Sequence, residues 1–308
     1  MRSEADGTAR QRDGKDVVRF QRRLAHPIGR VWAALTSPDE LHGWLGDAEI
    51  DLREGGRFVV CWLNTDEDGN AAEMHATITA LDPPRLLETE GDIHGVLRWE
   101  LEPDGDSTVL TFTSTLDLPD QFRFRALAGW HFHLDALDDA LRGQPFDWSR
   151  WEVSDWEKIL HQYLTRAKHE AFIEHWNAAA PAALADLFAP NGSIVGFDGS
   201  SVNGREEIAT HLGEIFASHR PARYVAKVRE IRTLADDVVL LRAVVGMVPP
   251  GEDDIKPEVN AVQTLVAVQQ GDDRGIAMLQ STPAQFHGRP DESERLTAEL
   301  REVLRRES

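Results

Sequence analysis

The chain has 308 residues and carries 53 acidic against 33 basic residues, which gives a formal net charge of -20 at pH 7. A field of this sign repels phosphate backbones and anionic lipid headgroups, so we expect no nucleic-acid partner and no membrane partner. No window approaches the roughly 18 consecutive apolar residues that a membrane span needs, and the polar N-terminus lacks the apolar core of a secretory signal. The single cysteine, Cys61, cannot form an intramolecular disulfide, so these features together predict a cytoplasmic protein.

The length exceeds the size at which one hydrophobic core usually keeps growing, which predicts two domains. We expect a disordered leader over residues 1–15, a first domain over 16–143, a linker over 144–154 and a second domain over 155–290. The charged tail, residues 291–308, carries apolar residues at helical spacing, so we expect it to form a docked amphipathic helix.

The first domain should open with a strand and a short helix, continue through a meander of strands, and close on a long helix. Apolar residues recur at helical spacing in the two predicted helices, whereas the runs between them are short and broken by glycine, proline and aspartate turns. The expected strands cover residues 17–24, 49–52, 57–63, 74–81, 86–90, 96–101 and 108–116, and the closing helix covers about 122–141. This order is typical of a helix-grip fold, in which the sheet curls round the last helix and encloses a cavity.

The second domain should begin with helices and end in a strongly apolar meander. We expect helices over residues 155–179, 182–188 and 206–217, a strand over 193–197, and long strands over 224–234, 238–248, 259–269 and 276–285. Helices followed by long strands indicate a cone-shaped α+β domain. The predicted fold class is therefore α+β in both halves.

Several motifs of the first half resemble one protein family. They are HPIGRVWAALTSP at residues 26–38, GGRF at 55–58, PPRL at 83–86, LRWE at 97–100 and GWHFHL at 129–134. Together they resemble the branch of the helix-grip (SRPBCC, START-like) superfamily that is similar to activators of the Hsp90 ATPase. The resemblance implies a small-molecule cavity, and co-chaperone members of the branch carry a further chaperone-binding domain that is not apparent in this sequence.

The second half resembles another superfamily. Its motifs are WNAA at residues 176–179, ALADLFAP at 183–190, GFDG at 196–199, RYVAKV at 223–228 and NAVQ at 260–263. They resemble the SnoaL-like part of the nuclear-transport-factor-like (NTF2-like) superfamily, closest to the group labelled SgcJ/EcaC. Members include polyketide cyclases, steroid isomerases, dehydratases and binding modules without chemistry, so the resemblance implies a pocket and leaves the reaction open.

The closing helix of the first domain carries the candidate ligand contacts of that domain. His131 and Asp135 are four residues apart and share a helix face, which predicts a histidine held by a carboxylate at the mouth of the cavity. Trp130 and His131 are the candidate ligand-binding residues. Only two converging ligands are visible, fewer than a zinc site needs, so we predict no metal. The sequence also lacks a glycine-rich phosphate loop, a dinucleotide fingerprint and a CxxC pair, so we expect no cofactor.

The resemblance to steroid isomerases can be tested by residue type in the second domain. Those enzymes use a strand carboxylate and a helix tyrosine, but Gly196 and Phe172 stand at the matching positions. Asp198, two residues further on, keeps the same strand face, and Arg242 interrupts an apolar strand, so we propose them as catalytic residues facing one cavity. A structural ion pair at Arg242 is the alternative. Further pocket candidates are Tyr224, Gln263 and Gln280.

Three functional hypotheses follow from these patterns. The first is a bacterial small-molecule-binding protein whose two cavities accept apolar or polyketide-like compounds in natural-product handling or stress response. The second is a cofactor-independent cyclase, isomerase or dehydratase acting in the second cavity, and the third is a co-chaperone-like or scaffolding protein. We also expect a homodimer through the second domain, because its strands 238–248 and 259–269 offer more apolar surface than one helical layer covers.

Overall fold

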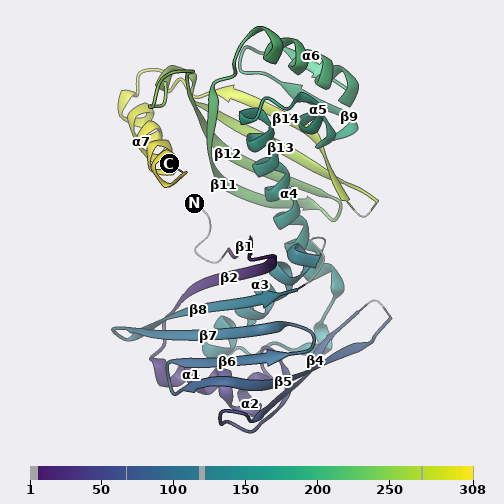
Figure 1. The fold of residues 1–308 in the computed structure, drawn as a ribbon, viewed down its shortest axis with the longest axis vertical. Coiled ribbons are helices and arrows are strands. Elements are labelled where there is room, and N and C mark those ends of the chain that lie inside the picture. The colour runs from purple at the N-terminus through teal and green to yellow at the C-terminus, as the bar shows by residue number, and fades with distance from the viewer. Residues whose placement is uncertain (1–5, 67, 118–121, 272, 308) are drawn as a thin grey trace. The chain divides into compact units, whose positions relative to one another are not determined.

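The computed structural model describes residues 6–66, 68–117, 122–271 and 273–307. Over these residues the protein is α+β and contains two large sheets, as the sequence predicted. The chain divides into two compact units, of which the first ends at Leu160 and the second begins at His161. Figure 1 traces the elements of both units.

The first unit is built on an eight-stranded antiparallel sheet with the order β1-β2-β8-β7-β6-β5-β4-β3. Most neighbours are consecutive in the chain, as in a meander, but β2 pairs with β8 and so joins strands from the two ends of the unit. The strands are β1 (Thr8–Arg12), β2 (Lys15–Leu24), β3 (Gly46–Ile50), β4 (Arg57–Thr65), β5 (Ala71–Asp82), β6 (Leu86–Gly91), β7 (Gly95–Asp104) and β8 (Ser107–Leu116). The helices are α1 (Ile28–Thr36), α2 (Pro38–Leu41) and α3 (Arg123–Leu141).

The sheet and α3 share one core. In β8 every second residue is buried, which is the period of a strand with one covered face. Along α3 the buried residues Leu127, Trp130, Leu134, Leu137 and Leu141 recur every three or four positions, which is the period of a helix face. The two periodicities meet on the same interior, an arrangement consistent with the predicted helix-grip fold.

A hairpin opens the first unit where the sequence predicted a disordered leader. Asp13 and Gly14 have φ of 53° and 76°, and they connect β1 to β2 with Arg12 paired to Lys15. Two consecutive residues with positive φ form the tight turn that Asp-Gly favours in hairpins. The prediction of a leader over 1–15 is therefore wrong for residues 8–15, because this turn adds an edge strand to the sheet. Residues 1–5 of the predicted leader lie outside the described residues.

The connection from α3 to the long helix α4 (Val153–Asn177) contains a short 3-10 helix, η2 (Trp148–Arg150). The indole nitrogens of Trp148 and Trp151 donate to backbone carbonyls of the first unit at 2.6 and 2.9 Å. The segment predicted as a linker, residues 144–154, is thus bonded to the first unit, and the division between the units falls later, inside α4.

The second unit is built on a six-stranded sheet with the order β10-β9-β14-β13-β12-β11. The pair β14 and β9 is parallel, and the other pairs are antiparallel. The strands are β9 (Phe188–Val195), β10 (Ser201–Asn203), β11 (Arg223–Ala235), β12 (Val238–Val248), β13 (Ala261–Gln270) and β14 (Asp273–Pro283). Besides α4, the helices are α5 (Pro181–Asp186), α6 (Arg205–Ser218), η3 (Pro257–Val259) and α7 (Pro290–Glu307).

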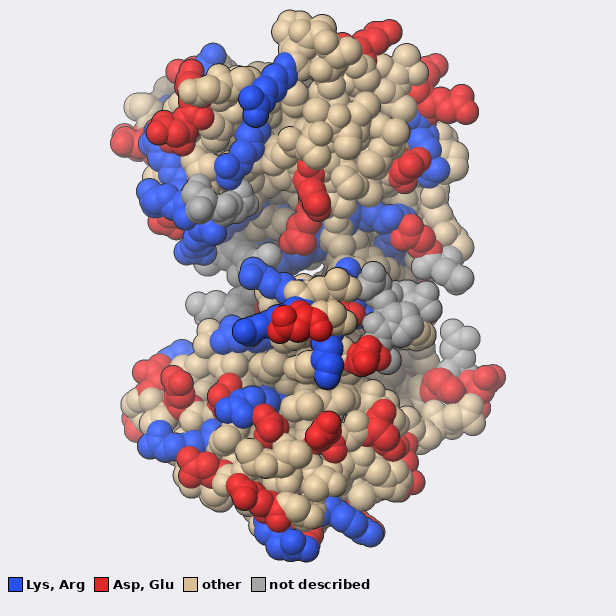
Figure 2. Space-filling view, in the orientation of Figure 1, with Lys and Arg blue, Asp and Glu red and all other residues tan. Residues whose placement is uncertain are grey.

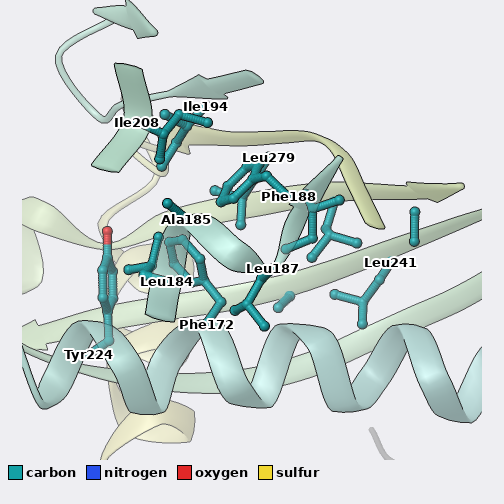
Figure 3. Packing of buried hydrophobic residues seen from close by; sticks show 14 of the residues in the cluster. Phe172, Leu184, Ala185, Leu187, Phe188, Ile194, Ile208, Tyr224, Leu241 and Leu279 are labelled. Carbon is teal, nitrogen blue, oxygen red and sulfur yellow. The ribbon is translucent and has the colours of Figure 1, made fainter. Parts of the chain in front are cut away.

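The two faces of the second sheet are covered by different helices. The inner face packs against α4, α5 and α6, and Figure 3 shows Phe172, Leu184 and Phe188 among the buried residues of this core. On the outer face, the helix expected at the C-terminus is present as α7, which covers part of β11 and β12 through a stripe that includes Leu300. Because α7 occupies part of the apolar surface on which the homodimer prediction rests, dimerisation stays a prediction.

The charged side chains are interspersed on the surface seen in Figure 2, where acidic and basic residues occur side by side. Such mixing, together with the net charge, is typical of a solvated surface. Within the described ranges, none of the helices combines the length and the apolar character that crossing a bilayer requires.

Candidate functional site

The interior of the first unit contains a cluster of aromatic rings. Trp130 of α3 is 2% exposed and lies 5.8 Å from Trp62 of β4, 5.7 Å from Trp99 of β7 and 4.4 Å from Phe112 of β8, measured between ring centroids. The two contacts among the indoles are edge-to-face, the geometry that aromatic quadrupoles favour. Trp130, a predicted ligand contact, therefore stands at the centre of this aromatic cluster.

Two histidines border the cluster. His94, in the turn between β6 and β7, lies 5.1 Å from Trp62 and 5.4 Å from Trp130. His133 of α3 places Nδ1 2.9 Å from the carbonyl oxygen of Trp44, and because a carbonyl only accepts, Nδ1 carries the proton. Burial lowers the pKa of both imidazoles to about 4, so both are neutral at neutral pH.

The aromatic cluster leaves hydrogen-bond donors unused. The indole nitrogens of Trp62 and Trp130 are buried and have no acceptor among the described residues. The indole of Trp44, by contrast, donates to the carbonyl of Ala34 at 2.9 Å. A buried donor without a partner costs about 1–3 kcal/mol, so two of them in one interior mark a place where an acceptor is missing.

His131 lies apart from this cluster. The predicted pair with Asp135 is present at 3.3 Å, and Asp135 also accepts from Arg22 of β2 at 3.2 Å. Trp130 and His131 are adjacent in sequence and so point about 100° apart on the helix, which separates the two predicted ligand contacts. No group of three or more metal-binding side chains occurs in the described part of the chain.

The structure does not bring Asp198 and Arg242 together. Arg242 lies on the outer face of β12, its side chain is 48% exposed, and it pairs with Glu230 of β11 at 3.2 Å. Asp198 is in the turn after β9, where it accepts hydrogen bonds from the backbone and hydroxyl of Ser200 that lower its pKa. The prediction of a shared cavity is wrong because Leu241 and the other odd-numbered residues of β12 face the inner core. The alternative of an ion pair at Arg242 is confirmed.

A buried polar cluster lies instead on the inner face of the second sheet. Gln263 of β13 places Oε1 2.9 Å from Nε2 of His169 on α4, and its amide donates to Ser281 of β14 at 3.3 Å. The Tyr224 hydroxyl is hydrogen-bonded to Ser281 and Gln263, but burial outweighs these bonds and raises its pKa to about 12. Burial also lowers the pKa of His169 to about 4, so the cluster is neutral.

Two predicted residues, Tyr224 and Gln263, belong to this polar cluster, and Gln280 does not. Gln280 is exposed because Ser281 stands directly opposite Gln263 across the β13–β14 pair, so Gln280 points to the other face. The sequence reasoning missed His169 and Ser281. His161, Thr165 and His169 recur at four-residue spacing, a signal that places all three on one side of α4.

A comparison with known protein families agrees with the resemblance predicted for the first half of the chain. Residues 25–142 match the family model described as activator of Hsp90 ATPase homolog 1-like protein. The resemblance predicted for the first domain is thereby confirmed, and the matched range includes Trp62, His94, Trp130 and His133. None of the curated proteins matches the chain.

Solved structures also resemble the chain. One is a domain of unknown function with a cystatin-like fold from Nostoc punctiforme, with 21% identity, coverage of 46% of this chain and 94% of that chain, and a TM-score of 0.39. Another is EF2215 of Enterococcus faecalis, a conserved protein of unknown function, with 20% identity, 53% and 91% coverage, and a TM-score of 0.43. CalU16 of Micromonospora echinospora has 25% identity, 50% and 96% coverage, and a TM-score of 0.37. TM-scores in this range do not establish a shared fold or function.

Proposed function

We propose that the protein binds a small molecule in the first unit, between α3 and the sheet. The observation that carries the proposal is the pair of buried indole donors, Trp62 and Trp130, which find no acceptor among the described residues. A ligand with acceptor atoms would satisfy both donors and recover the cost of leaving them unpaired. The match to a helix-grip family over residues 25–142 supports the same unit as the binding domain.

The residues of the aromatic cluster and the two bordering histidines define the chemistry of the ligand. The indole rings of Trp62 and Trp130 are nearly perpendicular, so they present both faces and edges to a flat apolar molecule. His94 and His133 are neutral at pH 7, so these two residues do not require a charged ligand. We therefore expect an uncharged, planar compound with one or two carbonyl or ether oxygens. Aromatic polyketides have this character, which supports the hypothesis of natural-product handling or stress response.

Calorimetric titration with chromone and naphthalene tests this assignment. The two bicyclic probes have similar size, but only chromone carries acceptor oxygens, so chromone should bind at least ten-fold more tightly. Trp62→Phe and Trp130→Phe remove one donor each and keep a ring, and each should erase most of that preference. Trp148→Phe is the control, because that indole already donates to a carbonyl. Equal binding of both probes would contradict the proposal, and native mass spectrometry would then search for a co-purified ligand.

A second candidate function, catalysis of the cyclase, isomerase or dehydratase type, rests on the buried polar cluster in the second unit. His169 and Tyr224 could move or hold a proton beside a carbonyl substrate. Ligand binding is preferred over catalysis because the His169 imidazole, with a pKa of about 4, is a weak base at pH 7. Deuterium exchange next to the carbonyl of 2-tetralone, followed by proton NMR, would report proton abstraction. If the protein accelerates this exchange and His169→Gln abolishes the acceleration, catalysis is favoured. If the exchange rate with the protein equals the rate without it, catalysis is excluded for this probe.

Co-chaperone or scaffolding function is the third candidate, favoured by the similarity of residues 25–142 to activators of the Hsp90 ATPase. A pull-down that recovers a chaperone, from a protein whose two units bind no ligand, would support it over ligand binding.

A homodimer through the outer face of the second sheet is also proposed. The supporting residues are Val238, Val266 and Met278, which are half-buried and lie beyond the cluster formed with α7. Stable interfaces bury about 1,200–2,000 Å² in total, so the patch would need flanking polar residues to contribute. Sedimentation at micromolar concentration should show a dimer that Val266→Glu dissociates, and a monomer under these conditions would refute it.

A further inference from the structure

Arg274 is a buried arginine of the second unit that has no acidic partner within hydrogen-bond distance among the described residues. It lies at the start of β14, and 1% of its surface is exposed. Its guanidinium donates to the backbone carbonyls of Asp237, Asp236 and Ala267 at 3.2, 3.4 and 3.5 Å. No carboxylate of the described residues forms an ion pair with it, and Asp237 acts only through space. Fully buried arginines usually have an anion beside them, so this one stands in an incomplete environment.

The nitrogen Nε marks the incomplete edge of the guanidinium. It is buried and has no acceptor in the described part of the chain. Together with the neighbouring Nη2, which makes only the 3.4 Å bond, it forms the planar fork that binds the two oxygens of a carboxylate.

His161 of α4 faces the same corner. Its imidazole bonds to the backbone carbonyl of Asp236, which Arg274 also contacts, and burial and the nearby Arg274 charge both lower its pKa. Nδ1 of this imidazole is buried and unpartnered over the described residues. Two cationic or potentially cationic groups therefore converge on one turn, between β11 and β12, and each has an unused nitrogen.

We propose that Arg274 and His161 form a binding site for the carboxylate of a small ligand. The carboxylate would accept from Nε and Nη2 of Arg274 and would favour a protonated His161, whose Nδ1–H would donate to it. This site is in the second unit and does not depend on the aromatic site of the first unit. It adds an anion-binding function to a protein whose surface charge is strongly negative, so the local positive charge would select the ligand by its acidic group.

The test is an NMR titration of the full chain labelled in its histidine rings. Sodium acetate should shift the His161 imidazole signals saturably at pH 7, whereas sodium chloride at the same ionic strength should not. Arg274→Lys keeps the charge but loses the planar fork, so it should weaken acetate binding at least ten-fold. Arg242→Lys is the matched control, because that arginine is exposed and pairs with Glu230 on the other face, and it should bind acetate as the native protein does.

A second measurement covers the case in which Arg274→Lys fails to fold. His161→Gln, at a half-buried position, should remove the rise in melting temperature that acetate produces over chloride. Absence of a saturable acetate effect in the native protein would overturn the site. An acetate effect in Arg274→Lys and His161→Gln as large as in the native protein would also overturn it. Saturation by inorganic phosphate without any response to acetate would overturn the carboxylate assignment.

Discussion

The interiors of the two units treat polar groups differently. In the first unit the rings of Trp62 and Trp130 pack edge-to-face, and their indole N–H groups have no acceptor among the described residues. In the second unit the central polar groups, Gln263 and His169 among them, are bonded to one another, whereas Nε of Arg274 and Nδ1 of His161 have no partner among the described residues. Under the proposed functions, unused hydrogen-bonding capacity, rather than the presence of a polar residue, marks where a ligand would bind, because bonded polar groups already have their stabilising partners.

The largest effect should come from shrinking the aromatic interior. Trp99→Ala removes a ring that packs 4.2 Å from Phe112 and 5.8 Å from Trp44, so it should cost about 3–5 kcal/mol of unfolding free energy. Urea unfolding followed by circular dichroism measures the loss. Leu52→Ala, at a 40% exposed side chain, is the control and should change stability by about 0.5 kcal/mol or less. A loss below about 1 kcal/mol at Trp99 would show that this interior is loosely packed.

Acid should destabilise the first unit more than the second. His94 and His133 have folded pKa values of about 4, below the ordinary value of 6.5. In the second unit His169 has the same value, and the pKa of His161 is also lowered. Between pH 6.5 and 4 these histidines are protonated in the unfolded chain but not in the folded chain. Their contribution to the free energy of unfolding is therefore fully present above pH 6.5 and is lost as the pH falls toward 4. Each histidine accounts for up to about 3 kcal/mol over this window.

Melting temperature against pH, together with ring NMR of the histidines, measures this acid effect. His133→Gln should flatten the profile of the first unit only in part, because His94 remains, whereas His169→Gln removes the residue of the second unit whose pKa is lowered to about 4. Histidine pKa values near 6.5 in the folded protein would contradict the prediction.

A smaller effect should separate the two glutamines of the second unit. Gln263→Met removes the partner of the buried His169 and one of the two hydrogen bonds of Tyr224, so it should cost about 1–3 kcal/mol. Gln280→Met changes an exposed residue of the adjacent strand and should cost about 0.5 kcal/mol or less. Chemical denaturation of both variants makes the comparison. Similar losses would mean that the buried cluster contributes no net stability.

The smallest effect is expected at Arg242. Because its guanidinium is exposed and pairs with Glu230, Arg242→Met should change stability by about 0–1 kcal/mol and leave deuterium exchange of 2-tetralone unchanged. Thermal melting and the exchange assay provide the two readouts. Loss of a measured activity in this variant would restore the catalytic reading of Arg242 that the sequence suggested.

Much of the local structure was predictable from the sequence because it depends on short-range patterns. Leucines at helical spacing predicted α7, and alternation with turn residues predicted the meander of the first unit. The exception was β1, where Asp13-Gly14 is a strong hairpin signal but the flanking residues are polar and read as a leader. The i,i+4 pair of His131 and Asp135 was also predictable, since both residues lie on one helix.

The sequence by itself thus determined the α+β class, the helix and strand periodicities, the family resemblance of residues 25–142 and the candidacy of Trp130, Tyr224 and Gln263. Only the tertiary structure decided which partners these residues meet. Whether Arg242 or Gln280 faces inward depends on strand register, and a shift of one position reverses it. The orphaned donors of Trp62, Trp130 and Arg274 were likewise invisible in the sequence, because a missing acceptor is a property of residues brought together from distant parts of the chain.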